Sequence, residues 1–313
     1  MRELLSIVVP VYNEVESIGE LHRRLTAAMA QLGDYELVLV DDGSTDGTWE
    51  ALRALADGDR RLRLIRLSRN FGHQTALSAG LEAARGDAVV SIDADLQDPP
   101  EVIPELVARW REGYDVVYAV RERRSGESRF KLATAALFYK GINRLSAMEI
   151  PEQAGDFRLL SRRALDGLLA MPERSRFLRG MSTWIGFRQI GVPYARDPRF
   201  AGATKYPLRK MARLATDAVT SFSTAPIRIV VTLGLLAVGF CLAALVWTLY
   251  LRLFTERTVQ GWTSVLVVLL FLGGVQLVSV GIIGQYVGRI FEEVKGRPLY
   301  LVAETIEPER VEE

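Results

Sequence analysis

Acidic residues gather at three points in the first hundred residues, and each group directly follows a run of apolar residues. The groups are residues 10–14 (PVYNE), 41–47 (DDGSTDG) and 93–100 (DADLQDPP). Neighbouring carboxylates repel one another unless a cation or hydrogen-bond donors neutralise them. The pattern therefore predicts a site that binds a cation, a polar ligand, or both.

The third group contains the spacing most typical of a metal site. Asp93 and Asp95 are separated by one residue, so both carboxylates can lie near one point where a strand ends. A hard divalent cation that also binds a nucleotide diphosphate would neutralise them, and Gln97 could add a neutral oxygen. With one cysteine and two histidines in the chain, the donors favour Mg²⁺ or Mn²⁺ over zinc. The structural alternative is a polar loop whose aspartates cap the helix that follows Pro99.

The second group combines turn residues with paired carboxylates. Gly43 permits a positive φ, and Asp46 can cap the next helix. Turn formation does not explain why Asp41 and Asp42 stand together at the end of an apolar run. These carboxylates could accept hydrogen bonds from a nucleotide base or ribose.

The elements that must position these groups alternate regularly over residues 1–120. Apolar residues recur at helical spacing between short apolar runs that predict strands. The predicted strands cover residues 4–12, 36–42, 62–67, 87–95 and 114–120. Alternating strands and helices predict an α/β fold, Rossmann-like with a mostly parallel sheet. Ligands bind at the carboxyl ends of such strands, which is where the acidic groups stand.

The C-terminal third has a different composition. Residues 229–251 and 258–288 carry no charged side chain, and each run is long enough to cross the roughly 30 Å core of a bilayer. Two buried core helices are the alternative, but soluble helices usually have a polar face. Residues 206–222 predict a basic amphipathic helix, which we expect to lie in the headgroup layer rather than only to expose a solvated face.

Basic residues flank the two predicted spans on their outer sides, so the positive-inside rule places both termini in the cytoplasm. We therefore predict a multi-pass protein of the inner or plasma membrane with a cytoplasmic catalytic domain. The predicted order is a catalytic domain (1–205), a juxtamembrane helix (206–226), two transmembrane helices (227–251 and 263–288) and a cytoplasmic tail (289–313).

Composition excludes several classes of protein. The chain has 313 residues, of which 49% are hydrophobic and 25% charged, so general disorder is excluded. A net charge of +1 argues against a dedicated nucleic-acid binder, and we predict no nucleic-acid partner. The single cysteine excludes disulfides within the chain.

The chain resembles the family 2 glycosyltransferases of the GT-A fold in three segments, SIVVPVYNE, VLVDDGSTDGT and SIDADLQDPP. Later segments narrow the resemblance to the polyprenyl-phosphate glycosyltransferases, which include dolichol-phosphate mannose synthase and bacterial bactoprenol glucosyltransferases. These segments are GDFRLLSRRAL (155–165), ERSRFLRGMSTWIGF (173–187), RFAGATKYPLRKM (199–211) and SFSTAPIR (221–228). Together with the two spans, the resemblance covers nearly the whole chain.

The resemblance implies transfer of a hexose from a nucleotide sugar to undecaprenyl or dolichyl phosphate, with inversion at the anomeric carbon. It also implies roles for individual residues. The nucleotide would contact Pro10, Tyr12, Glu14 and Asp42, and the metal would bind Asp93, Asp95 and Gln97. Asp156 stands where the family has an acceptor-side aspartate, and the phosphates of donor and acceptor would bind Arg129, Arg179, Arg199 and Lys205.

The residue types suit this chemistry. A departing nucleoside diphosphate develops negative charge that a metal and cations stabilise. A phosphate monoester is largely dianionic at neutral pH and hardly needs a general base, so we expect Asp156 to act first in positioning. A cap or a salt bridge from Asp156 to Arg158 is the structural alternative, and any one arginine could be a solvated surface charge.

Several alternatives stay open. UDP-glucose is the preferred donor, while GDP-mannose, UDP-N-acetylhexosamine and a UDP-linked modified arabinose remain alternatives. A non-catalytic scaffold that binds nucleotide sugars is a rival from a different class. In the second span, Gly281, Gly284 and Gly288 share one helix face, which invites close helix packing. A homo-oligomer is therefore expected, and similar proteins suggest a tetramer.

Overall fold

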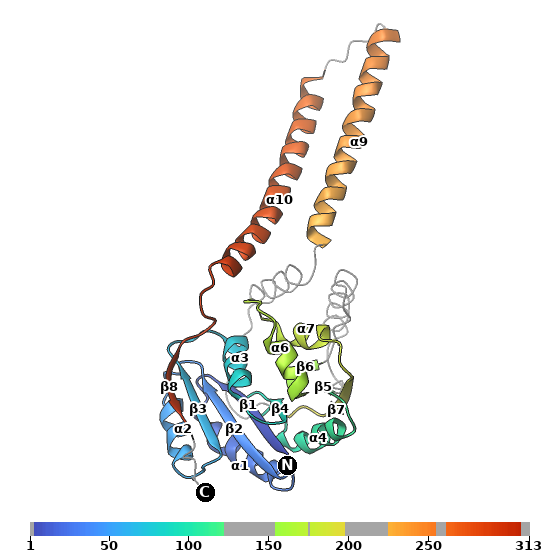
Figure 1. Ribbon diagram of the computed structural model, residues 1–313. Helices are drawn as coiled ribbons and strands as arrows, with labels where there is room; N and C mark the ends of the chain where they lie inside the picture. The colour runs from blue at the N-terminus through green and yellow to red at the C-terminus, as the bar shows by residue number, and fades with distance from the viewer. Residues whose placement is uncertain (1–2, 122–153, 175, 198–224, 255–260, 308–313) are drawn as a thin grey trace. The chain divides into compact units, whose positions relative to one another are not determined.

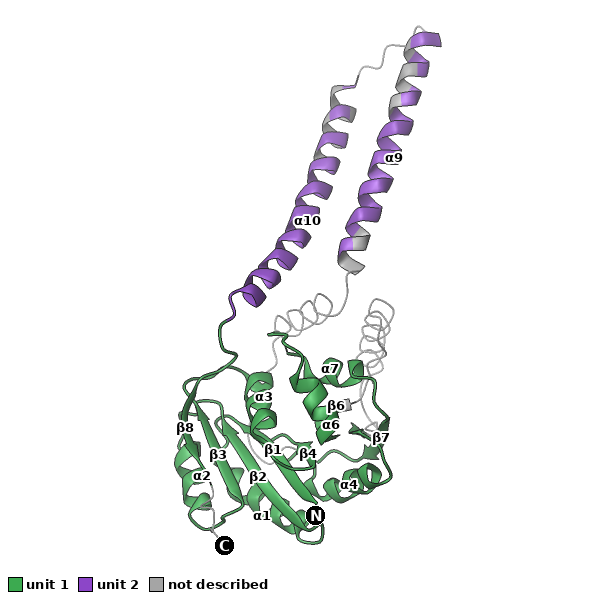
Figure 2. Cartoon of the chain, in the orientation of Figure 1, with its two compact units in different colours: residues 1–140, 148–207, 297–313 green, residues 141–147, 208–296 purple. Residues whose placement is uncertain are grey.

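The computed structural model describes residues 3–121, 154–174, 176–197, 225–254 and 261–307. The chain forms two compact units (Figure 2). The first comprises residues 1–140, 148–207 and 297–313, and the second comprises residues 141–147 and 208–296. The predicted juxtamembrane helix at 206–226 lies almost entirely outside the described residues.

A single twisted sheet organises the first unit (Figure 1). In the described residues its strands run in the order β7-β5-β6-β4-β1-β2-β3-β8. Their bounds are β1 (Leu4–Val11), β2 (Asp34–Asp41), β3 (Leu62–Leu67), β4 (Ala88–Ser91), β5 (Val116–Arg121), β6 (Ala154–Ser161), β7 (Gln189–Tyr194) and β8 (Val302–Ile306). The central strands β4, β1, β2 and β3 are mutually parallel, so their carboxyl ends share one edge.

Helices cover both faces of this sheet. They are α1 (Ile18–Met29), α2 (Thr48–Ala56), α3 (His73–Ala83), η1 (Pro100–Val102), α4 (Ile103–Arg111), α6 (Arg162–Leu169) and α7 (Leu178–Trp184). One buried cluster joins the sheet to α1, α2 and α4, and a second joins it to α3, α6 and α7. The sheet is therefore the middle of three layers, as expected for parallel strands that are apolar on both faces.

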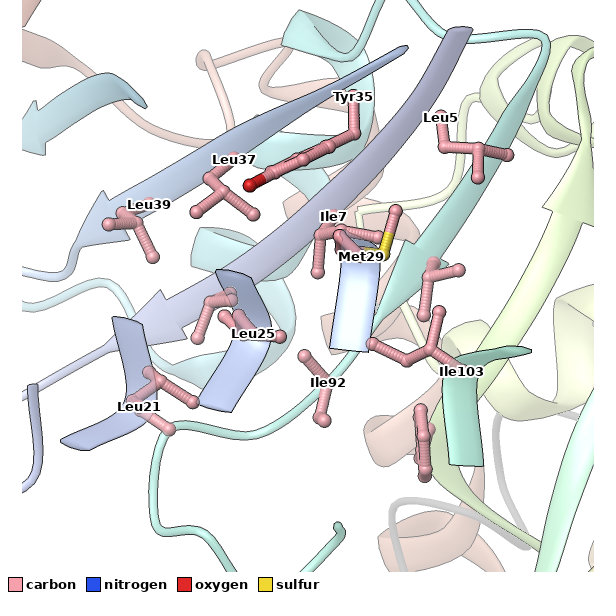
Figure 3. Packing of buried hydrophobic residues seen from close by; sticks show 14 of the residues in the cluster. Leu5, Ile7, Leu21, Leu25, Met29, Tyr35, Leu37, Leu39, Ile92 and Ile103 are labelled. Atoms are coloured by element: carbon pink, nitrogen blue, oxygen red, sulfur yellow. The ribbon is translucent and has the colours of Figure 1, made fainter. Parts of the chain in front are cut away.

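The helical periodicity seen in the sequence forms the first cluster. Leu21, Leu25 and Met29 project from α1 toward Ile7 of β1 and Leu37 of β2 (Figure 3). All five side chains are almost completely buried. Burial of each side chain of this size stabilises the fold by roughly 1.5–3 kcal/mol before conformational entropy is counted.

On the opposite face, α3 packs closely against the sheet. A Cβ atom added at Gly80 would lie 2.3 Å from Cγ1 of Val8 and 3.0 Å from Cγ2 of Val40. Only glycine allows this approach, which brings the N-terminal turn of α3 to the edge where β1 and β2 end.

The sheet is mostly parallel, as predicted, but it also contains a strand that the sequence did not predict. The predicted strand at 114–120 is β5, and it is not next to β4. Instead β6 lies between them and is antiparallel to both. A strand can enter a sheet from a distant part of the chain, and the local pattern of β5 contains no information about that neighbour.

The C-terminal segment also differs from the predicted tail. Residues 302–306 form β8, which pairs antiparallel with β3 at the edge of the sheet. This strand is short and its side chains are mostly exposed, so its sequence has little of the apolar pattern that identifies a buried strand. The catalytic unit thus includes chain from both sides of the predicted spans.

The second unit contains two long helices, α9 (Ala225–Phe254) and α10 (Trp262–Val294), which pack against each other. They occupy the region where the sequence predicts two transmembrane helices. Among the described residues, one segment is both long and apolar enough to cross a membrane, Phe271–Val294. Within the described residues of α9 the apolar stretch is shorter, Val230–Ala244, so the described residues contain one candidate span where the sequence predicts two.

Candidate active site

The loops that follow β1 and β2 are joined by hydrogen bonds at the carboxyl edge of the sheet. The backbone N–H of Asn13 donates to Oγ of Ser44 (2.9 Å), and the N–H of Thr45 donates to Oδ1 of Asn13 (2.9 Å). The N–H of Glu14 donates to Oγ1 of Thr48 (2.9 Å). Asn13 adopts a φ of +54°, which Asn tolerates better than most residues. The first two acidic groups therefore form one rigid rim.

The predicted nucleotide-binding residues all lie on or beside this rim. Pro10 is in β1, and Tyr12, 46% exposed, follows the end of the strand. The Glu14 carboxylate accepts a hydrogen bond from Oγ of Ser17 (2.8 Å). An exposed aromatic ring beside hydrogen-bonding loops suits a planar base.

Asp42 has a structural task in addition to any contact with a ligand. Its two carboxylate oxygens accept hydrogen bonds from the backbone N–H groups of Phe71 (2.7 Å) and Gly72 (2.9 Å). Burial raises the pKa of the Asp42 carboxyl, and these two hydrogen bonds oppose that rise. Asp42 thereby fixes the chain directly before α3.

His73 begins α3 and lies between two carboxylates. Its Nε2 is 3.4 Å from Oδ1 of Asp93 and 3.5 Å from Oδ2 of Asp156. Asp93 follows β4, and Asp156 is in the neighbouring strand β6. Burial lowers the pKa of His73, but the two carboxylates outweigh burial and the pKa is raised. The antiparallel strand that the sequence did not predict thus brings the third acidic group and Asp156 together.

The sequence does not single out His73, because a lone histidine is more often structural. A usable signal exists in its position. His73 starts a helix directly after a strand of the parallel series, and therefore stands at the same sheet edge as the acidic groups.

Asp156 is held as an ionised carboxylate. Nε2 of Gln74 donates to Oδ2 of Asp156 (2.9 Å), and Nη2 of Arg179 lies 3.6 Å from its Oδ1. Burial raises the pKa of Asp156, but the His73 ring and nearby arginines outweigh burial. The pKa therefore lies well below its usual range.

Arg158 is not the ion-pair partner of Asp156 that the structural alternative requires. Its guanidinium donates to the backbone oxygen of Gly155 (2.7 Å) and to Oγ of Ser182. Burial lowers the pKa of Arg158 to about 10, although the nearby charge of Asp156 opposes that change. The predicted phosphate-binding residue Arg179, in contrast, is in direct reach of Asp156.

Asp93 is in an environment that disfavours its charge. Burial raises the pKa of the Asp93 carboxyl to about 6, and nearby Asp156, Asp98 and Asp95 add to the effect against the opposing influence of His73. A carboxylate surrounded by others is stabilised by a cation. The donor chemistry at Asp93 is therefore suited to a divalent metal ion.

Asp95 and Gln97 complete the turn after Asp93. Oδ1 of Asp95 accepts a hydrogen bond from the N–H of Gln97 (3.1 Å), and Leu96 between them has a φ of +57°. This conformation is unfavourable for a leucine and is found mainly where surrounding structure enforces it. No group of three or more His, Cys, Asp or Glu residues arranged for a metal occurs in the described part of the chain. Asp93 and Asp95 provide two carboxylates, so a metal at this turn would complete its coordination with other oxygens, such as those of Gln97, water or a bound diphosphate.

Asp98 anchors this loop and was not predicted as a site residue. It is fully buried, accepts a hydrogen bond from the Tyr194 hydroxyl, and lies 3.6 Å from Nη2 of Arg121 and 3.5 Å from Nε of Arg196. Three other predicted residues, Arg129, Arg199 and Lys205, lie outside the described residues.

Comparison with known proteins identifies the family of the chain. Residues 6–169 match the family described as glycosyl transferase family 2. The chain belongs to glycosyltransferase family 2, is a glycosyltransferase, and has the GT-A α/β fold with a mostly parallel sheet.

Relatives match the chain over almost its whole length. A glycosyltransferase of Bacillus subtilis, YkcC, is 48% identical over 95% of this chain and 92% of its own. The SfII prophage-derived bactoprenol glucosyl transferase of Shigella flexneri is 42% identical over 95% of this chain and 97% of its own. Among solved structures, glucosyl-3-phosphoglycerate synthase of Mycobacterium tuberculosis is 25% identical with a TM-score of 0.47, covering 70% of this chain and 79% of its own.

Proposed function

We propose that this protein transfers glucose from UDP-glucose to a polyprenyl phosphate at the cytoplasmic face of the membrane, with inversion of the anomeric carbon. The long, nearly complete match to bactoprenol glucosyl transferases supports the substrate pair. The observation that carries the proposal is the pairing of Arg179 with Asp156 beside Asp93. This pairing places an arginine that can bind a phosphate next to carboxylates that are suited to a metal ion.

On the donor side, Asp93 and Asp95 would hold a divalent ion, Mg²⁺ or Mn²⁺, which would neutralise the charge that develops on the leaving diphosphate. Gln97 adds a possible neutral ligand. The rim formed by Tyr12, Glu14 and Asp42 supports the nucleotide. Asp93 and Asp95 do not themselves react; through the metal ion they would orient the diphosphate.

On the acceptor side, Arg179 binds the phosphate monoester and Asp156 orients the arginine. A phosphate oxygen of the acceptor attacks the anomeric carbon as the bond from that carbon to the diphosphate breaks, and UDP leaves. A single displacement of this kind inverts the anomeric carbon. Because the acceptor is already an anion, no general base is needed, and the lowered pKa of Asp156 makes its carboxylate a weak base.

Two membrane crossings follow if α10 crosses at all. Strands β3 and β8 are paired in one sheet, although they precede and follow the helical unit in the chain. A single crossing would place them on opposite sides of the bilayer, which the pairing forbids. We therefore propose that α9 and α10 both cross, with the catalytic unit and both termini in the cytoplasm.

A direct transfer assay tests the function. Protein in nanodiscs would receive undecaprenyl phosphate and labelled UDP-glucose, GDP-mannose or UDP-N-acetylhexosamine, with Mg²⁺, Mn²⁺ or a chelator. We expect label from UDP-glucose to enter the lipid fraction and to be lost with chelator. Transfer from another donor would change the sugar that we assign to the donor, but the assigned type of reaction would stay the same. Binding of nucleotide sugar by folded protein without transfer from any donor would favour a non-catalytic scaffold.

Self-association is proposed for the helical unit. Among the residues that the structure describes, a Cβ atom added at Gly281, Gly284 or Gly288 would meet no atom within 4 Å, which leaves room at this face of α10 for another helix. Crosslinking in native membranes should give a homo-oligomer, with a tetramer as the expected size, and a purely monomeric pattern would contradict this.

A further inference from the structure

The chain returns from α10 to the sheet through residues 297–301 (RPLYL), which we call the return segment. The N–H of Ser68, directly after β3, donates to the backbone oxygen of Leu301 (2.8 Å). The Tyr300 hydroxyl donates to Oε2 of Glu82 in α3 (2.5 Å), and the Tyr300 ring packs against the second hydrophobic cluster. The return segment is therefore held on the same helix that begins with His73.

The loop before α7 is attached to the same place. The Arg174 guanidinium donates to the backbone oxygens of Arg297 and Pro298. Nη1 of Arg176 lies 3.5 Å from Oε1 of Glu82, whose other oxygen accepts from Tyr300. Glu82 therefore joins the loop to the return segment.

Arg176 is an unusual choice for a purely structural contact. Its side chain is only 8% exposed, and its Nε and Nη1 atoms are buried without a hydrogen-bond partner in the described residues. Burying an incompletely paired guanidinium is costly. A buried guanidinium with this energetic cost is expected where its position matters for the function of the protein.

From this loop the contacts continue into the site. The N–H of Leu178, the first residue of α7, donates to Oε1 of Gln74 (3.2 Å), and Nε2 of the same side chain donates to Asp156 (2.9 Å). The next residue, Arg179, pairs with Asp156. The start of α7 is thus fixed from two sides, by Gln74 in the site and by Arg176 at the return segment.

We propose that Tyr300, Glu82 and Arg176 are positioning residues for the acceptor phosphate, because they hold the start of α7 and thereby the guanidinium of Arg179. The inference rests on the proposed function, since it assumes that Arg179 binds the polyprenyl phosphate. The return segment begins three residues after α10 in the chain. The arginine that meets the lipid headgroup is therefore linked to the helix proposed to cross the lipid.

Tyr300→Phe tests the proposal with the smallest change, because it removes one hydroxyl and keeps the packed ring. We expect the KM for undecaprenyl phosphate to rise about threefold to tenfold, the range of one hydrogen bond. The KM for UDP-glucose should not change. Arg176→Gln should have the same selective effect, and the double variant should be little worse than the stronger single one, because both contacts meet at Glu82.

Arg85→Gln is the matched control. It removes another hydrogen bond that fastens the C-terminal segment, from Nη2 of Arg85 to Oε2 of Glu307 (2.9 Å), which does not involve α7. Its KM values should match those of the unchanged protein. An unchanged acceptor KM in folded Tyr300→Phe would overturn the proposal, as would an equal rise in the Arg85→Gln control.

Hydrogen exchange of full-length protein in nanodiscs provides a readout that needs no substrate. Amides of residues 178–184 should exchange faster in Tyr300→Phe than in Arg85→Gln. If they do but no lipid acceptor is glycosylated by the unchanged protein, the proposed function fails while the structural coupling stands. If transfer occurs but exchange and acceptor KM are the same in both variants, the positioning role fails alone.

Discussion

The two aspartates Asp42 and Asp93 lie at the same edge of the sheet but differ in how the protein satisfies them. Asp42 accepts two backbone N–H groups, so hydrogen bonds from the fold partly compensate the burial of its charge. Asp93 has other carboxylates nearby, and the His73 ring, which carries a charge only when protonated, lies 3.4 Å from its Oδ1. The difference indicates that Asp42 organises the site through the fold, whereas Asp93 is the carboxylate that we propose for binding a cation.

The largest expected effect is on the cation side. Asp95→Ala should lower transfer about a hundredfold or more, because the leaving diphosphate loses charge stabilisation. The thermal unfolding midpoint should stay close to that of the unchanged protein. Steady-state transfer and circular dichroism measure both quantities, with exposed Asp57→Ala as the control. Normal turnover in Asp95→Ala would remove it from the metal site.

The acceptor side should respond differently. Arg179→Ala should raise the KM for undecaprenyl phosphate roughly tenfold or more, since a charged hydrogen bond to phosphate contributes about 1.5–3 kcal/mol. The KM for UDP-glucose should change little. A selective effect on the donor instead would place Arg179 at the diphosphate.

On the compensated side, the expected effect is on stability. Asp42→Asn leaves one backbone N–H facing an amide group, which should lower the free energy of unfolding by about 1–3 kcal/mol. Chemical denaturation in detergent measures it. If the variant is as stable as the unchanged protein but no longer binds UDP, then Asp42 serves the nucleotide alone.

The smallest expected effect is a pH dependence of the metal-free protein. Because the pKa of Asp93 is raised to about 6 in the folded state, the folded protein binds more protons than the unfolded one between about pH 4 and 6. Asp93 should therefore lower the unfolding midpoint as pH rises through this window. Asp93→Asn should remove that component, and a profile identical to that of the unchanged protein would show that the component does not arise from Asp93.

The sequence was sufficient for the parallel half of the fold, because β1 to β4 and their helices have clear apolar periods. For example, Ile18 and Leu21 are buried as their spacing predicts. It was insufficient for β6 and β8, whose places depend on pairing with distant segments. Asp93, Asp95 and Asp156 were predicted because motif residues stand out locally.

His73, Gln74 and Asp98 were missed for the opposite reason. Each is a common polar residue whose importance comes from its neighbours in space, such as Tyr194 for Asp98 and Asp156 for Gln74. No local pattern encodes those contacts.

Calorimetric measurement of UDP binding, with and without Mn²⁺, tests most directly whether Asp95 serves the metal and diphosphate while Arg179 serves the acceptor phosphate. We predict metal-dependent binding that is lost in Asp95→Ala and retained in Arg179→Ala. Equal UDP affinity with and without Mn²⁺, or retention of metal-dependent binding in Asp95→Ala, would contradict the assignment of these carboxylates to the metal and diphosphate.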